Sequence, residues 1–189
     1  MTTDLKLVEV QEDPSLMREI MALRVVAWRS YIKVDPKVQE WTDQFDATAR
    51  HWAILDGQTV AASARLSIHD RLSEVPDNEV YEPLLATLVR SPIGSMNRLV
   101  VHPGYRGRQL SDQLDEVRMS AAESSGCACL IGHTHAGDKR VTQLKAKGFQ
   151  ALGTGRTNEH GLLKGLAGIV VYCPLPRAAH TSLPLVPPG

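Results

Sequence analysis

The segment from Leu99 to Ser111 constrains the fold of this chain more than any other stretch. Leu99-Val100-Val101 predicts a buried strand, which runs directly into a tight turn that contains Gly107. Apolar residues at positions 110, 114, 117 and 121 then recur at helical spacing and predict an amphipathic helix. The first amides of a helix have no partner within it and lie at its positive end. A strand, a tight turn and a helix start in this order therefore predict a pyrophosphate-binding loop.

The residue types of this turn suit phosphate oxygens. Gly107 permits a positive φ or a close approach of the backbone to a ligand. Arg106 and Arg108 add guanidinium donors, which match phosphate geometry better than a point charge does. A plain turn with solvated arginines is the alternative interpretation. The predicted cofactor-binding residues are Leu99, Val100, Val101, Arg106, Gly107, Arg108, Gln109, Leu110 and Ser111.

The sequence from Val101 to Ser111 resembles the acyl-CoA loop of GNAT acetyltransferases. The pattern of that loop is Gln or Arg, two residues, Gly, one residue, and Gly or Ala. Arg106 takes the first position, whereas Gln109 and Ser111 stand where the pattern has its two small residues. The resemblance implies a GNAT fold, with acetyl-CoA or a longer acyl-CoA as co-substrate and no metal.

A second stretch, from Arg140 to Phe149, resembles the next motif of the same family, a short helix that closes in Gly-Phe. Many members carry a tyrosine there as general acid, and Leu144 takes that position here. The two resemblances together span roughly Met96 to Leu152.

The N-terminal half is similar to acyl-homoserine-lactone synthases and the related N-acyl amino acid synthases, which share the GNAT fold. In those families an Asp pair and arginines on the central strands organise the acceptor side of the cleft. The strand-four Glu of the family falls on Ser95 and is absent. The similarity rests on the order and spacing of six residues, Arg24, Trp28, Asp43, Asp46, Arg65 and Arg98, and it implies substrate binding by the first five.

The implied chemistry needs little covalent help, because a thioester is already activated toward a neutral amine. The site must align the two reactants, offer a strand N–H to the thioester oxygen and accept one proton. His133 and His135 follow a short apolar strand and are candidate bases. The alternative is that both are polar loop residues. Asn97 and Arg98 complete the predicted catalytic residues.

Arg98 lies in an apolar strand, where an unpaired guanidinium would be costly. It therefore needs a carboxylate partner or a ligand. Asp43 and Asp46, three residues apart, would share one face of a helical turn and are the expected partners.

Hydrophobic periodicity predicts one mixed α/β (α+β) domain over residues 1–175, followed by a Pro-rich tail at 176–189. We expect a mostly antiparallel central sheet flanked by helices. The predicted strands are 4–10, 51–55, 59–68, 96–101, 127–131, 149–152 and 168–172, with a hairpin turn at Asp56-Gly57. The predicted helices are 15–31, 81–89, one that begins near 110, and 138–147, with a further polar helix or helical turn at 36–40.

The composition of the chain limits the kinds of partner and the compartment that we expect. Lys plus Arg and Asp plus Glu number 21 each, so no net field attracts nucleic acid. The longest apolar runs are far shorter than the ~20 residues of a membrane span, and the polar N-terminus does not resemble a signal sequence, so we expect a cytoplasmic protein. Three cysteines disfavour a disulfide framework. Zinc binding by Cys127, Cys129, His133 and His135 matches no common spacing, and we expect no metal.

The sequence thus predicts an N-acyltransferase that moves an acyl group, expected to be acetyl, from acyl-CoA to a small-molecule amine. One alternative is a synthase of long-chain N-acyl amino acids or acyl-homoserine lactones, with coenzyme A or acyl carrier protein as the acyl carrier. The other is a silent acyl-CoA-binding regulatory module. An exposed edge strand near Gly168 to Tyr172 would allow a homodimer.

Overall fold

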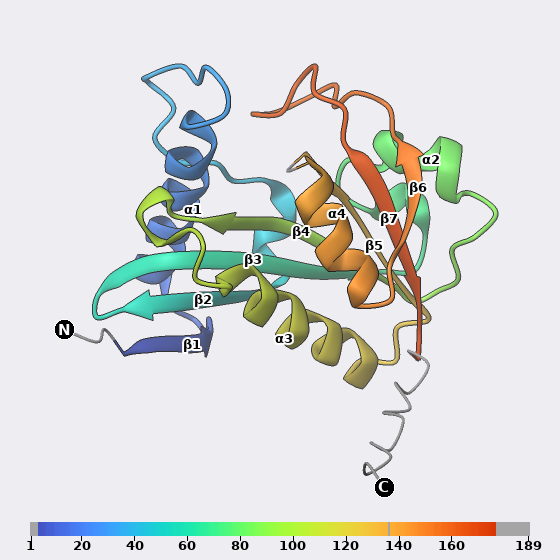
Figure 1. Ribbon diagram of the computed structural model, residues 1–189, viewed down its shortest axis with the longest axis horizontal. Helices are drawn as coiled ribbons and strands as arrows, with labels where there is room; N and C mark the ends of the chain where they lie inside the picture. The colour runs from blue at the N-terminus through green and yellow to red at the C-terminus, as the bar shows by residue number, and fades with distance from the viewer. Residues whose placement is uncertain (1–3, 136, 177–189) are drawn as a thin grey trace, which may run out of the picture.

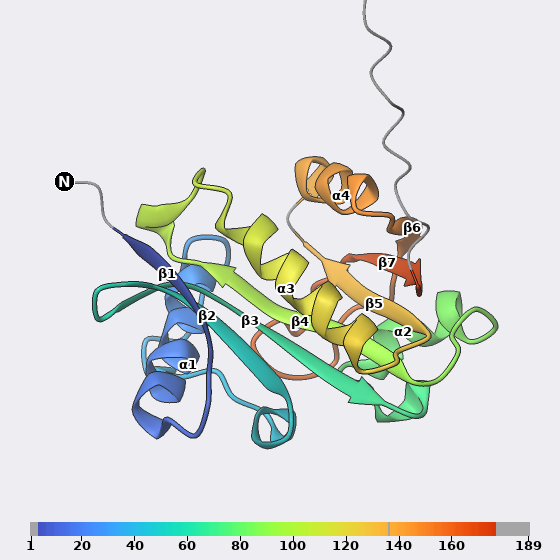
Figure 2. The same ribbon diagram turned by 90° about the horizontal axis from the view of Figure 1, so that it is seen from below.

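The computed structural model describes residues 4–135 and 137–176, and there a seven-stranded sheet lies between two pairs of helices (Figures 1 and 2). The strand order is β1-β2-β3-β4-β5-β7-β6. β4 and β5 are parallel, and every other neighbouring pair is antiparallel. The strands are β1 (Leu5–Glu9), β2 (Arg50–Asp56), β3 (Thr59–His69), β4 (Ile93–Val101), β5 (Cys129–Thr134), β6 (Gln150–Thr154) and β7 (Ile169–Pro174). This mixed, mostly antiparallel sheet confirms the predicted fold class.

Alternating side chains of the strands divide the core between the two faces of the sheet. On β2, Trp52 and Ile54 pack in one cluster with Leu114, whereas Ala53 packs in another with Leu23. One face is therefore covered by α3 (Leu110–Ser124) and α4 (Gly137–Ala146), and the other by α1 (Pro14–Arg29) and α2 (Asn78–Leu85).

Helix α1 begins where the sequence indicates. The Asp13 side chain accepts hydrogen bonds from the amides of Ser15 and Leu16, and Pro14 takes the first helical position. The apolar stripe of the helix, represented by Ile20 and Leu23, packs against the sheet. This packing places the C-terminal end of α1 beside the loop that follows β4 (Figure 1).

The pairing of β4 changes abruptly in its second half. Ile93 to Ser95 pair with β5, and beyond Ser95 the two strands diverge (Figure 1). On the other edge of β4, the register with β3 shifts between Ser63 and Arg65. Arg98 lies in this bulge with a φ of 53°, a left-handed conformation that is uncommon outside glycine. The bulge and the divergence open a cleft in the middle of the sheet.

Two local predictions need correction. Residues 36–40 form no helix, and only a turn is present at 36–37, because this segment lacks an apolar stripe. A 3₁₀ turn follows at Gln44–Ala47, where Asp43 and Asp46 supply a capping box. β7 is not an edge strand, because it pairs with β5 on one side and with β6 on the other. The argument for a homodimer from an exposed edge at Gly168 to Tyr172 therefore fails.

The other predicted elements are present within a few residues of their expected bounds. The tail predicted for 176–189 lies, from residue 177 onward, outside the described residues. No helix in the described ranges is long and apolar enough to cross a membrane.

Candidate active site

The cleft between β4 and β5 has a volume of about 760 Å³ and is bounded by α1, α3 and α4. Thirteen of the predicted site residues line it: Trp28, Asn97, Arg98, Leu99, Val100, Val101, Arg106, Gly107, Gln109, Leu110, Ser111, His133 and His135. Arg24, Asp43, Asp46, Arg65 and Arg108 do not line it. The structure thus brings most of the predicted cofactor residues, and all four predicted catalytic residues, to one surface.

One end of the cleft is the first turn of α3. Gly107 has a φ of 81° and Gln109 a φ of 59°, so the chain uses two left-handed residues to enter the helix. The amides of Asp112 and Gln113 both donate to the Gln109 carbonyl. Earlier amides in the turn have no carbonyl partner within the helix, so they remain available to an anion.

The two arginines of the turn do not converge on this helix start. The Arg106 guanidinium donates to the Ala27 carbonyl at 3.2 Å and to Ser30 Oγ at 2.8 Å. It thereby ties the turn to the end of α1. Arg108 lies over the Tyr105 ring, 5.1 Å from its centroid, and does not line the cleft. Phosphate binding by these side chains stays a prediction, whereas the backbone of the turn is positioned for it.

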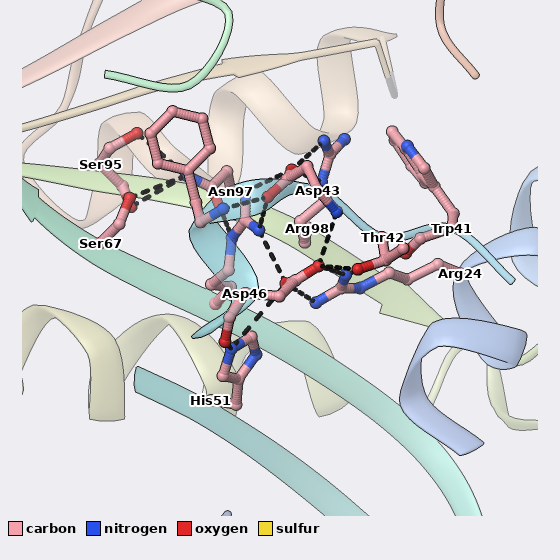
Figure 3. Close-up of polar contacts among 12 residues, drawn as sticks. Arg24, Trp41, Thr42, Asp43, Asp46, His51, Ser67, Ser95, Asn97 and Arg98 are labelled. Carbon is pink, nitrogen blue, oxygen red and sulfur yellow. Dashed lines mark hydrogen bonds and ion pairs between the residues drawn. The ribbon is translucent and has the colours of Figure 1, made fainter. Parts of the chain in front are cut away.

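Five charged side chains form an ion network beside the Arg98 bulge: Arg24, Asp43, Asp46, Arg65 and Arg98 (Figure 3). Arg24 donates to both Asp46 oxygens at 2.9 Å. Arg65 donates to Asp43 at 2.6 Å and to Asp46 at 2.7 Å. Arg98 donates to Asp43 Oδ2 from Nη2 at 2.5 Å, which confirms the carboxylate partner expected for it. Three guanidinium groups and two carboxylates thus share one site.

These contacts hold the carboxylates ionised. Burial alone raises the pKa of Asp46, but hydrogen bonding and charge from Arg24, with charge from Arg65, outweigh it and bring the pKa below its usual value. The pKa of Asp43 is lowered in the same way, against burial, chiefly by Arg65 and then by Arg98. The two carboxylates therefore stay ionised at neutral pH.

Burial separates this network into two groups. Arg24 and Arg65 are at most 1% exposed, and with Asp46 they line neither the cleft nor the smaller cavity beside it. Asp43 and Arg98 reach a second, smaller cavity next to the cleft. Substrate contact by Arg24, Asp46 and Arg65 stays a prediction; their hydrogen bonds orient Asp43 and, through it, Arg98.

A chain of hydrogen bonds leads from the network to His133. Arg65 Nε donates to Asn97 Oδ1 at 2.5 Å, which directs the Asn97 amide nitrogen to Ser95 Oγ at 3.1 Å. The Ser95 side chain is a polar neighbour of the Tyr81 phenol, whose oxygen lies 2.9 Å from His133 Nδ1. Ser95, in the place of the absent glutamate, is therefore a member of a polar chain across the sheet.

These hydrogen bonds bear on the tautomer and the protonation state of His133. Burial raises the pKa of Tyr81, so the phenol stays protonated and is able to donate to His133 Nδ1. In that pairing the His133 proton is on Nε2. Burial, with the nearby charges of His135 and Arg98, lowers the pKa of His133 from 6.5 to about 3, so the ring is neutral. His133 offers a hydrogen-bond donor rather than a base.

His135 has the opposite form. Its Nδ1 lies 3.0 Å from the Ala167 carbonyl, which can only accept, so Nδ1 carries the proton. Nε2 is a buried acceptor without a partner among the described residues. Burial lowers the pKa of His135, although its bond to Ala167 opposes that shift. The Trp28 ring packs edge-on against it, with 5.7 Å between centroids.

The sequence interpretation missed three residues that the fold brings to this region. Tyr81 was placed only as part of a helix, and its one signal is a buried aromatic ring whose hydroxyl needs a partner. Asp77 follows Pro76 in a segment that reads as a plain loop, and it lines both cavities. Asn158 lies in the connection between β6 and β7, where no pattern marks it.

The described residues contain no group of three or more His, Cys, Asp or Glu side chains that could hold a metal. The histidines of the cleft are instead used in hydrogen bonds to Tyr81 and to the Ala167 carbonyl. The site as built can bind an anion at α3 and hold neutral imidazoles beside a ligand.

Comparisons with known proteins agree with this geometry. The profile of the "Acetyltransferase (GNAT) family" matches residues 17–149. No curated protein sequence matches the chain.

Three solved structures illustrate the shared fold. FeeM, an N-acyl amino acid synthase from uncultured soil microbes, is 13% identical, with 92% of this chain and 93% of that chain covered and a TM-score of 0.66. The ribosomal-protein-S18-alanine N-acetyltransferase from Escherichia coli is 14% identical, with 94% and 99% covered and a TM-score of 0.59. The NatC complex bound to Gag peptide and CoA is 12% identical, with 90% and 99% covered and a TM-score of 0.57.

Proposed function

Because the chain belongs to the acetyltransferase (GNAT) family and is therefore an acyl-CoA-dependent N-acyltransferase, we propose that it acylates a small-molecule amine, with acetyl as the group transferred. The observation that carries this proposal is the cleft itself. It opens where β4 leaves β5 at the Arg98 bulge, and it ends at the free amides of α3.

The residues present fit a coenzyme A thioester. The amides from Gly107 to Ser111 would hold its pyrophosphate, and the space on the side of Gly107 where a Cβ would stand is open for at least 4 Å. Beyond Ser95 the half of β4 that has left β5 would offer backbone groups to the extended part of the molecule. When bound, the thioester supplies the activated carbonyl that the amine attacks.

The two histidines divide the remaining tasks. His133, held with a proton on Nε2, is a donor for an oxygen in the cleft. His135, held with a lone pair on Nε2, accepts the proton that the attacking amine must lose. Both side chains line the cleft, and their ring centroids are 5.1 Å apart. A donor and an acceptor therefore lie within one substrate's reach.

The group transferred is tested by thiol release. We would incubate the protein with acetyl-, octanoyl- and palmitoyl-CoA and a panel of small amines. We expect turnover with acetyl-CoA. Turnover only with the longer chains would replace this proposal by a long-chain N-acyl amino acid or acyl-lactone synthase, and the same assay with acyl carrier protein as donor would identify the carrier. Thermal stabilisation by coenzyme A without release from any donor would indicate a silent binding module.

A further inference from the structure

A second cavity of about 190 Å³ adjoins the cleft. Trp41, Asp77, Arg98 and Leu163 line both spaces, so a ligand that reacts in the cleft can extend into the cavity. At ~30 Å³ per water molecule, the cavity has room for about six waters or a short aliphatic chain with one polar end.

Three hydrogen-bond acceptors in this region lack partners among the described residues. Asn158 is 3% exposed, lines the cavity and has no partner for Oδ1 among the described residues. The Asp77 side chain has no hydrogen bond or ion pair with any residue that the structure describes, and its left-handed backbone (φ 58°) holds it at the junction of the two spaces. In the cleft, His135 Nε2 is a third such acceptor.

Unpaired buried acceptors are uncommon, because each costs about 1–3 kcal/mol when water is lost and no donor replaces it. A ligand that donates several hydrogen bonds would remove that cost. A ligand carboxylate would not, since it brings only more acceptors.

Arg98, the arginine that lines the cavity, already has a carboxylate partner. Arg98 directs both Nε and Nη2 to Asp43, and its guanidinium lies 3.8 Å from the centroid of the Trp41 ring. It is therefore poorly placed to form a new two-pronged pair with a carboxylate. Asp77, in contrast, has no salt bridge among the described residues, and Arg98, the cation that acts on it most strongly, is already paired with Asp43, so the junction can still accept a ligand with positive charge.

From this arrangement we propose that the acceptor is a small aliphatic amine with a second hydrogen-bond donor, such as a diamine or an amino alcohol. This inference rests on the proposed function. The reacting amine lies in the cleft beside His135, Asp77 compensates its charge before it loses its proton, and the distal amino or hydroxyl group donates to Asn158 Oδ1 in the cavity.

Binding measured without turnover tests the inference. With coenzyme A present and no acyl donor, calorimetry would compare 1,4-diaminobutane, 4-amino-1-butanol and n-butylamine. We expect the first two to bind at least tenfold more tightly than n-butylamine, which lacks the distal donor. Equal affinities, no binding of any of them, or tighter binding of L-serine, which carries a carboxylate, would overturn the inference.

Matched variants locate the effect. Asn158→Leu keeps the size of the side chain and should bring the three affinities to that of n-butylamine. Asn158→Asp keeps the shape and should strengthen binding of 1,4-diaminobutane, a gain that no loss of stability would produce. Asp77→Asn, which tolerates the same backbone conformation, should weaken the binding of 1,4-diaminobutane at least tenfold. An unchanged diamine affinity in both Asn158→Asp and Asp77→Asn would count against the site.

The outcome is separable from that of the proposed function. Tight diamine binding without thiol release from any acyl-CoA would refute catalysis and leave the cavity inference intact. Thiol release at equal efficiency with n-butylamine and 1,4-diaminobutane would support catalysis and refute the cavity inference.

Discussion

Gln109 holds a conformation that glycine adopts at little cost. Its φ of 59° is left-handed, and it stands where the acyl-CoA loop pattern has glycine. A left-handed non-glycine residue costs roughly 1–2 kcal/mol, whereas glycine loses about 0.4–1 kcal/mol through the entropy of the unfolded chain. We therefore expect Gln109→Gly to raise the free energy of unfolding by about 0.5–1 kcal/mol in urea titrations. Gln109→Ala, which keeps the strain, is the control, and an equal gain in both variants would contradict this explanation.

His135 is the residue on which the proposed proton transfer depends. Its lowered pKa keeps Nε2 unprotonated below the ordinary histidine value of 6.5, so the acidic limb of a kcat profile should lie below that pH. We expect His135→Ala to lower kcat by roughly 10²–10⁴-fold, the usual contribution of a general base. Steady-state kinetics from pH 5 to 9 measure both effects.

A matched pair of variants at His133 distinguishes its role from that of His135. His133→Gln keeps an N–H donor in the cleft, so it should retain more activity than His133→Ala and leave the acidic limb in place. If the acidic limb of the kcat profile were lost in His133→Gln but kept in His135→Ala, His133 rather than His135 would be the general base.

The first turn of α3 is the element on which cofactor binding depends. An acidic residue there suits the helix dipole, so Ser111→Asp should fold at least as well as the natural chain, yet its charge would oppose a pyrophosphate. We expect its dissociation constant for coenzyme A to rise at least tenfold, about 1.4 kcal/mol, in calorimetric titrations. Ser120→Asp adds the same charge at an exposed position farther along α3 and should change affinity little. Equal losses in both would place the phosphate site elsewhere.

A buried ion cluster fastens α4 to α3. Asp115 is fully buried and accepts from Arg118 at 2.7 Å and from Arg140 at 2.5 and 2.8 Å. Asp115→Ala would leave both guanidinium groups without their carboxylate, so we expect a loss of about 3–5 kcal/mol of unfolding free energy, measured by urea titration. Arg140→Met, which leaves the Asp115–Arg118 pair intact, should cost clearly less. A smaller loss in Asp115→Ala than in Arg140→Met would contradict this role.

At the scale of the whole molecule, local patterns predicted the elements well and their neighbours less well. The strand and helix around Gly107 were predictable because turn chemistry and periodicity are properties of adjacent residues. The edge position assigned to residues 168–172 was wrong because periodicity does not report strand order, and β6 lies outside β7.

The candidate site shows the same division. The Arg98–Asp43 pair could be predicted because an arginine in an apolar strand requires a carboxylate, and Asp43 and Asp46 share one face of a helical turn. The Tyr81–His133 hydrogen bond and the smaller cavity lined by Asn158 could not be predicted, because each joins residues from separate elements with no shared local pattern. Long-range packing decides such contacts, and a single sequence does not display it.

The buried histidines make the stability of the whole fold depend on pH. The folded pKa of His133 lies near 3, below the 6.5 of the ordinary side chain, and those of His51, His69 and His135 are lowered as well, in each case with burial as the main cause. Below pH 6.5 the unfolded chain binds protons that the folded chain does not, so stability is complete above 6.5 and declines as the pH falls toward 3.

Each such histidine contributes a slope of at most about 1.4 kcal/mol per pH unit. Asp77 acts in the opposite direction, because burial raises its pKa and its contribution grows as the pH falls. Asp43 and Asp46 contribute a nearly constant stabilisation between pH 8 and 5, since their lowered pKa values keep them ionised there in the folded protein. We therefore expect the free energy of unfolding to fall between pH 6.5 and 5, by about 2 kcal/mol from His133 alone. Urea titrations of the natural chain and of His133→Gln at pH 8, 6.5 and 5 measure this contribution as the difference between two slopes, and equal slopes would show that His133 is protonated in the folded protein.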